Sequence, residues 1–213
     1  MKIKICGLKD PDNIKAVTAL APDYAGFIFF GQSLRYAEDL PVSILKDMPA
    51  TIIKTAVFVN ETAETINALI DKFKFDAIQL HGNESPDFCS LFINKVQVIK
   101  AFGVGEAFDF DTLSEYADKV DYFLFDTKTK NHGGSGEVFN WSILKKYHLN
   151  TPFFLSGGLN IQNLEEVKNI DNPQFYGVDL NSKFEITPGI KDIKLLTKAF
   201  NILHKTYTDE LRS

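Results

Sequence analysis

Two residues whose side chains can exchange protons stand at the ends of two short apolar segments. Cys6 ends the segment at 2–6, and Asp126 ends a much later one at 121–126. A thiol has a reference pKa of about 8.5, so a modest stabilisation of the thiolate makes it a usable base near neutral pH. A carboxyl group can act as the matching acid when burial or nearby negative charge raises its pKa. The pair predicts an enzyme, provided that the fold brings the two segment ends together.

Short segments rich in β-branched and aromatic residues alternate with amphipathic segments along the chain. The candidate strands are residues 2–6, 24–30, 52–59, 76–80, 96–102, 121–126, 152–156 and 175–180. Between them, residues such as 62–73 repeat apolar side chains at helical spacing. Eight such units, each of roughly 25 residues, predict a single closed (β/α)₈ TIM barrel. The alternative is an open doubly wound sheet, which shares the alternation and usually has fewer strands.

Three helix starts can be proposed from capping residues. Asp10 followed by Pro11 predicts the start of the first helix, and Asn60 or Thr62 can cap the third. Asn160 can cap the seventh. We expect the barrel to comprise residues 1–205, with 206–213 as a C-terminal tail.

The composition is that of an ordinary soluble globular protein. The chain has 213 residues, of which 45% are hydrophobic and 24% charged, and its 19 phenylalanines predict a bulky interior. The formal net charge of −5 argues against a nucleic-acid binder and leaves room for a local basic pocket that holds one phosphate. We therefore expect a small-molecule partner, and a monomer or a weak homodimer.

The two cysteines predict no disulfide and no zinc site. Cys6 and Cys89 form no Cys-x-x-Cys pair and no Cys/His spacing typical of a metal site. No apolar segment reaches the roughly 18 residues that cross a bilayer, and the amino terminus has no signal-peptide pattern. We expect reduced thiols, no membrane association and a cytoplasmic location. Cys89, inside the helical segment 84–93, is expected to be structural.

Polar residues follow most of the candidate strands, and in a barrel the carboxyl ends of all strands share the rim that carries active sites. The glycines of Ser156-Gly157-Gly158 would let backbone N–H groups approach an anion, and Asn181 and Ser182 follow the last strand. These two loops predict a phosphate site, with a simple tight turn as the alternative for the glycine pair. The polar, glycine-rich segment 127–136 is expected to close over substrate, and His132 within it is given no role.

Each residue also has a purely structural interpretation. Cys6 could be a small buried hydrophobic residue, as free cysteines often are. Asp126 could cap a helix or order a loop, and Arg35 could be a surface arginine.

Taken together, several short motifs resemble one family. They are Lys4-Ile5-Cys6-Gly7, Ser33-x-Arg35-Tyr36, Val57-Phe58-Val59-Asn60, Gln79-Leu80-His81-Gly82, Phe125-Asp126, Gly133-Gly134-x-Gly136, Leu155-Ser156-Gly157-Gly158-Leu159, Gly177-Val178-Asp179 and Pro188-Gly189-x-Lys191-Asp192. In this order and spacing the chain resembles the phosphoribosylanthranilate isomerases, barrel enzymes of the tryptophan pathway, over essentially its whole length.

The resemblance implies an Amadori rearrangement of N-(5-phosphoribosyl)anthranilate to 1-(o-carboxyphenylamino)-1-deoxyribulose 5-phosphate, with no metal or organic cofactor. It implies that Asp126 protonates the furanose ring oxygen and that Cys6 removes the proton from C2 of the sugar. Arg35 matches the position that pairs with the anthranilate carboxylate. His81 and Asp179 match rim positions that contact the sugar or organise the site.

The chain departs from the family pattern at two positions. Asn181-Ser182-Lys183-Phe184-Glu185 stands where the family commonly has Ser-Ser-Gly-Val-Glu, so Lys183 either contacts the phosphate or points to solvent. Leu34 replaces a proline found in many relatives.

Three other functions are alternatives. One is the histidine-pathway isomerase, whose acid and base are two aspartates. Another is a different aldose-ketose isomerase or an epimerase, and the last is a catalytically silent barrel that binds a partner.

Overall fold

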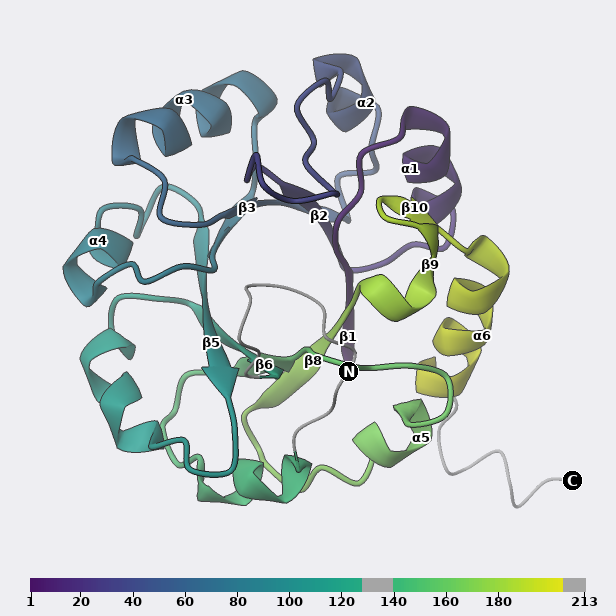
Figure 1. The fold of residues 1–213 in the computed structure, drawn as a ribbon. Helices are drawn as coiled ribbons and strands as arrows, with labels where there is room; N and C mark the ends of the chain where they lie inside the picture. The colour runs from purple at the N-terminus through teal and green to yellow at the C-terminus, as the bar shows by residue number, and fades with distance from the viewer. Residues whose placement is uncertain (128–139, 205–213) are drawn as a thin grey trace, which may run out of the picture.

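Eight parallel strands close into a barrel in the computed structural model, which describes residues 1–127 and 140–204 (Figure 1). The strands are β1 (Lys2–Ile5), β2 (Tyr24–Ile28), β3 (Ile53–Phe58), β4 (Ala77–Leu80), β5 (Gln97–Val104), β6 (Tyr122–Thr127), β7 (Phe153–Leu155) and β8 (Phe175–Leu180). β1 pairs with both β2 and β8, which leaves the main sheet without an edge. The predicted (β/α)₈ barrel is confirmed, and the alternative of an open doubly wound sheet is wrong.

Helices surround the barrel in Figure 1, and their lengths differ widely. The α-helices are α1 (Pro11–Thr18), α2 (Val42–Lys46), α3 (Ala63–Phe73), α4 (Pro86–Ser90), α5 (Leu164–Val167) and α6 (Ile193–His204). The 3₁₀ helices are η1 (Phe110–Tyr116), η2 (Trp141–Lys146) and η3 (Ser182–Phe184), and η3 leads into a small antiparallel hairpin of β9 (Glu185–Thr187) and β10 (Ile190–Lys191). Two crossovers expected as α-helices are therefore 3₁₀ helices.

Two of the three proposed helix starts are confirmed. The side chain of Asp10 accepts a hydrogen bond from Asn13 N at 2.8 Å, and Pro11 is the first residue of α1. Thr62, rather than Asn60, caps α3, and its Oγ1 accepts from Thr65 N at 3.2 Å.

The prediction that Asn160 caps a helix is wrong. α5 begins at Leu164, four residues later, and has no side-chain cap. The side chain of Asn160 instead accepts from Gln162 N at 2.8 Å and stabilises the turn before the helix. The same hydrogen-bonding capacity serves a turn or a cap, so residue type alone could not distinguish them.

Aromatic side chains fill the barrel near the amino ends of the strands. Tyr24, Tyr122 and Tyr176 begin or nearly begin β2, β6 and β8, and the rings of Tyr122 and Tyr176 lie 4.7 Å apart. Tyr24 and Tyr176 share a hydrogen bond of 3.4 Å between their hydroxyl groups, and Phe154 packs edge-on against both rings. This layer closes the end of the barrel at which the strands begin. Any open cavity therefore lies at the other end, where the strands finish.

The two segments outside the described residues include two predictions. Apart from Thr127, the segment expected to close over substrate lies in 128–139, and so does His132. The expected C-terminal tail lies in 205–213. Among the described helices, none combines the length and the apolar character needed to cross a membrane.

Candidate active site

A cavity of about 320 Å³ opens where the barrel strands end. All nine residues proposed from the sequence line it: Cys6, Arg35, His81, Asp126, Gly157, Gly158, Asp179, Asn181 and Ser182. Cys6 and Asp126, which are far apart in the sequence, therefore share one cavity. Polar side chains share the lining with apolar ones, among them Ile28, Phe30 and Val57. Such a mixture suits a ligand that carries both an apolar ring and charged groups.

Cys6 lies directly after β1, and only 3% of the residue is exposed. Its backbone N–H donates to the carbonyl of Leu180 at 3.0 Å, which ties the residue to β8. A Cβ atom on Gly26 would approach the Cys6 sulfur to 2.7 Å, so this glycine provides space for the thiol. Burial raises the pKa of Cys6, and the neighbouring charge of Lys4 only partly offsets this effect. The thiol form therefore dominates without a ligand.

A buried ion pair lies beside the thiol. Lys4 Nζ is 3.0 Å from Asp179 Oδ1, and the two residues are register partners on β1 and β8. Lys4 is completely buried and Asp179 is 5% exposed. Burial raises the pKa of Asp179, against the opposing effect of Lys4. Lys4 and Cys6 are two positions apart, and residues at this spacing in an extended segment point to the same face, so both side chains point into the barrel. This spacing is the signal that could have identified Lys4 from the sequence.

The side chain of Asp126, near the end of β6, contacts the next residue of that strand and a residue of the loop after β4. Its Oδ1 accepts from Thr127 N at 2.8 Å, and its Oδ2 lies 3.5 Å from His81 Nε2. Gln79 Nε2 lies 2.8 Å from His81 Nδ1, and His81 Nε2 is the ring nitrogen that faces Asp126. Gln79 is 1% exposed, and its position in the sequence did not predict this contact.

The Ser156-Gly157-Gly158 loop approaches the acid closely. Gly157 and Gly158 have φ angles of 84° and 68°, in the left-handed region that favours glycine. A Cβ atom on Gly157 would lie 2.6 Å from Asp126 Oδ1 and 2.4 Å from Thr127 N. Any side chain at this position would displace the loop from Asp126. The glycines therefore fit close backbone packing.

In the loop after β8, Asn181 and Ser182 reach the cavity, whereas Lys183 is exposed and is absent from its lining. Asn181 Oδ1 accepts from Lys191 Nζ at 2.8 Å, so this side chain is already engaged. Of the two alternatives for Lys183, the solvent-facing position is the observed one.

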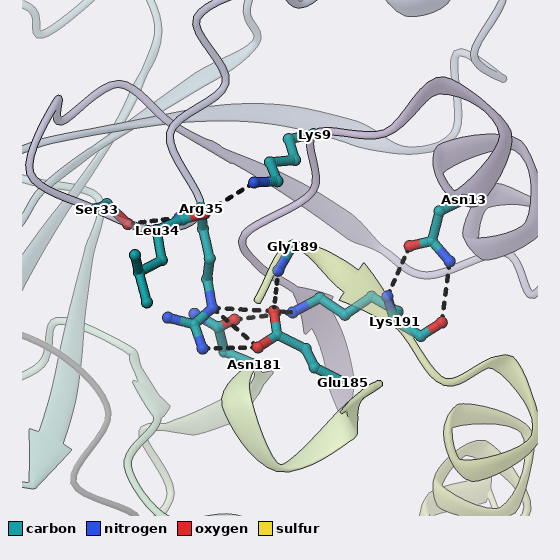
Figure 2. Close-up of polar contacts among 9 residues, drawn as sticks. All are labelled: Lys9, Asn13, Ser33, Leu34, Arg35, Asn181, Glu185, Gly189 and Lys191. Atoms are coloured by element: carbon teal, nitrogen blue, oxygen red, sulfur yellow. Dashed lines mark hydrogen bonds and ion pairs between the residues drawn. The ribbon is translucent and has the colours of Figure 1, made fainter. Parts of the chain in front are cut away.

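Arg35 enters the cavity from the loop after β2 while a carboxylate holds one edge of its guanidinium group. Glu185 accepts from Arg35 Nε at 2.9 Å and from Nη2 at 2.6 Å (Figure 2). Leu34 is 73% exposed, and its carbonyl accepts from Lys9 Nζ at 2.9 Å, which holds the loop that lacks the proline of many relatives. The structural interpretation of Arg35 as a surface arginine is wrong, because its side chain is 19% exposed and firmly paired.

The raised pKa of Cys6 predicts a thiol that reacts slowly near neutral pH. Alkylation of Cys6 by iodoacetamide is expected to be slower at pH 7 than that of free cysteine and to accelerate about tenfold per pH unit up to pH 9, because only the thiolate attacks. Mass spectrometry of the Cys89→Ser variant follows this single thiol. Restricted access would lower the rate at every pH but would leave its pH dependence unchanged. A rate that levels off below pH 8 would contradict the raised pKa.

The fold and the site define a class: a barrel enzyme with an acid and a thiol that face one cavity at the carboxyl ends of the strands. A family model described as N-(5'phosphoribosyl)anthranilate (PRA) isomerase matches residues 3–202. The chain belongs to this family.

Similar proteins cover nearly the whole chain. The N-(5'-phosphoribosyl)anthranilate isomerase of Parabacteroides distasonis is 45% identical over 208 residues, which are 96% of this chain and 94% of that protein. The Phocaeicola vulgatus enzyme is 42% identical over 193 residues, 90% of this chain and 92% of that protein. The crystal structure of the Thermotoga maritima enzyme superposes with a TM-score of 0.85 at 31% identity, covering 95% of this chain and 98% of that one.

Proposed function

We propose that this chain converts N-(5-phosphoribosyl)anthranilate to 1-(o-carboxyphenylamino)-1-deoxyribulose 5-phosphate, the aldose-ketose isomerisation of tryptophan biosynthesis. Membership of the isomerase family supports the reaction. A related structure, 28% identical with a TM-score of 0.81, contains the reduced form of this product. The observation that carries the proposal for this chain is the shared cavity of Cys6 and Asp126, since the rearrangement needs one acid and one base in reach of the same sugar.

Asp126 is the acid in this proposal. Its protonated carboxyl gives a proton to the furanose ring oxygen, the C1–O bond breaks, and the substrate nitrogen stabilises C1 as an iminium ion. The Thr127 N–H fixes one carboxyl oxygen and His81 faces the other, so the group is held at a defined position. Positioning of this kind lets a proton move without reorganisation of the site.

Cys6 is the base. The iminium ion makes the proton on C2 more acidic, and the Cys6 thiolate removes it to give an enolamine that tautomerises to the ketone. The raised pKa of Cys6 makes the thiolate scarce in the free enzyme. A cationic intermediate beside the sulfur favours the charged form. Lys4 supplies further positive charge next to Cys6 and sets the position of Asp179 at the sugar.

The charged ends of the substrate have separate partners. The backbone of Gly157, Gly158 and Ser182 offers N–H groups to the phosphate, and Arg35 meets the anthranilate carboxylate. The proposed reaction consists of ring opening and proton transfers, with no net oxidation or reduction, so the proposal includes no metal or organic cofactor. Among the described residues, no group of three or more His, Cys, Asp or Glu side chains is placed to hold a metal ion.

Purified protein incubated with N-(5-phosphoribosyl)anthranilate tests the function, because the substrate fluorescence disappears as it is converted. The histidine-pathway aminophosphoribose is the comparison substrate, and we expect no turnover of it, since a thiol stands where that isomerase has an aspartate. Absence of turnover with the first substrate would reject the proposed reaction and favour a silent binding barrel.

Replacement of Arg35 with alanine is expected to raise KM for N-(5-phosphoribosyl)anthranilate about tenfold or more while kcat changes less, because the substrate carboxylate keeps its charge throughout the reaction. Steady-state kinetics separate the two constants. A large fall in kcat with unchanged KM would place Arg35 in the chemical step instead.

We also propose a cytoplasmic location, which keeps the Cys6 and Cys89 thiols reduced. The proposed assembly is a monomer or a weak homodimer. A related structure is described as monomers of a dimeric isomerase, and it is 26% identical to this chain. The proposed domain organisation is one barrel over residues 1–205.

A further inference from the structure

A buried cluster of three charged side chains stands behind one wall of the cavity. Glu185 in β9 accepts hydrogen bonds from Arg35 and from Lys191 Nζ, the latter at 2.8 Å (Figure 2). The Gly189 N–H also donates to Glu185 at 3.0 Å. The Glu185 and Lys191 side chains are 4% and 0% exposed, so the carboxylate is almost fully enclosed by groups that donate to it.

Arg35 is the member of this cluster that lines the cavity, and Asn181, another lining residue, accepts from Lys191 Nζ. Arg35 belongs to the lining, whereas Glu185 and Lys191 do not. Arg35 uses Nε and Nη2 to bind Glu185, and no hydrogen bond from Nη1 occurs within residues 1–127 and 140–204. One edge of the guanidinium group is therefore fixed from behind, and the remaining nitrogen is free to meet a ligand.

The support behind Glu185 extends to the first helix. The backbone of Lys191 exchanges two hydrogen bonds with the side chain of Asn13, at 2.8 and 2.9 Å. Asn13 lies in α1, so these bonds tie the β9–β10 hairpin to the first helix. A Cβ atom on Gly7 would lie 2.7 Å from Arg35 Cδ, which leaves Arg35 little room to move toward that loop.

The charges of the cluster also keep the Glu185 carboxylate ionised. Two cations and one anion leave the cluster with one net positive charge. Although burial alone would raise the pKa of Glu185, the hydrogen bond from Arg35 and the charge of Lys191 lower it. Glu185 therefore stays ionised between the two side chains that donate to it.

We propose that Glu185 is a positioning residue that orients Arg35 toward a carboxylate on the aromatic ring of the substrate, which makes it a determinant of substrate selectivity. This inference rests on the proposed function. An unrestrained arginine loses rotamer freedom when it binds a ligand, and a prearranged one has already lost it. Glu185 thereby strengthens recognition of the carboxylate without touching it.

A merely structural role for Glu185 would give a different result. If Glu185 only neutralised Lys191, its loss would lower stability and weaken all ligands alike. Positioning of Arg35 predicts that the loss falls on ligands that carry the ring carboxylate. The informative quantity is therefore the ratio of two dissociation constants, measured with and without that carboxylate.

Two probes provide this ratio. One is reduced 1-(o-carboxyphenylamino)-1-deoxyribulose 5-phosphate, the compound bound in a related structure, and the other is the same compound without the carboxyl group. Calorimetric titration of the full-length chain is expected to show that Glu185→Gln reduces the preference for the carboxylated probe about tenfold. In an Arg35→Ala background the same change is expected to have no further effect on the preference.

Glu84→Gln is the matched control. Glu84 forms a comparably buried ion pair with Lys100 at 3.1 Å, and neither residue lines the cavity. This variant is expected to lose stability in a thermal melt while the preference for the carboxylated probe stays at the wild-type value.

The preference of each variant for the carboxylated probe decides whether Glu185 positions Arg35. If Glu185→Gln keeps the wild-type preference while Arg35→Ala loses it, the positioning role is wrong. If Glu185→Gln does not fold, Glu185→Asp keeps the charge beside Lys191 and withdraws the carboxylate, and a preference lowered at least about threefold supports the role. An unchanged preference in Glu185→Asp overturns it. Failure of the proposed function would appear separately, as a wild-type chain that neither turns over substrate nor binds either probe.

Discussion

Cys6→Ala is expected to lower kcat for N-(5-phosphoribosyl)anthranilate by about a hundredfold or more, with a change of less than about threefold in KM. The sulfur acts only when the C2 proton is removed, after the ring has opened. Its loss therefore leaves binding of the substrate largely intact. Cys6 is 3% exposed and packs against Gly26, so alanine fits in the same space and leaves only a small cavity in place of the sulfur. Cys6→Ser keeps the volume more closely, and it is also expected to remain slow because a hydroxyl is a far weaker base.

Loss of substrate fluorescence under steady-state conditions measures both constants. Cys89 provides the matched control, since it is the other buried thiol, lies in α4 and is absent from the cavity lining. Cys89→Ala is expected to keep wild-type kinetics, although the protein becomes less stable. Wild-type turnover in Cys6→Ala would show that another group removes the C2 proton.

The architecture could be predicted because the apolar pattern and the chain order carry it. Each predicted strand overlaps an observed one, with differences of up to two residues at its ends. Cys6 and Asp126 could be proposed together because parallel strands of a barrel all finish at one rim. The pattern could not separate α from 3₁₀ geometry at 110–116 and 141–146. Over six or seven residues, repeats of 3.0 and 3.6 place the same apolar side chains toward the barrel.

The supporting polar residues could not be predicted in the same way. The side chains of Glu185 and Lys191 are buried, whereas such residue types are mostly exposed in proteins. They tolerate burial because each has a partner, and the Glu185 partner Arg35 lies 150 positions away in the sequence. Such pairings depend on the closed fold, so only the structure reveals them.

Asp126→Asn is expected to reduce kcat by about a hundredfold or more, again with a modest effect on KM. An amide can hydrogen-bond to the furanose ring oxygen but cannot give up a proton at neutral pH, so the ring stays closed and the iminium ion does not form. The carboxamide has nearly the shape of the carboxyl group and still has an oxygen to accept from Thr127 N. The loss should therefore reflect proton transfer rather than misfolding.

Asp121→Asn provides the same chemical change at the other end of β6. Asp121 accepts from Val98 N at 2.7 Å and does not line the cavity, so this variant is expected to keep its kcat. If Asp126→Asn also kept wild-type turnover, His81, which contacts that position, would be the next candidate for the acid. An equal loss in both variants would indicate damage to β6 instead. A loss confined to Asp126→Asn would assign ring opening to the one carboxyl group that the barrel places between the Gly157 loop and the imidazole.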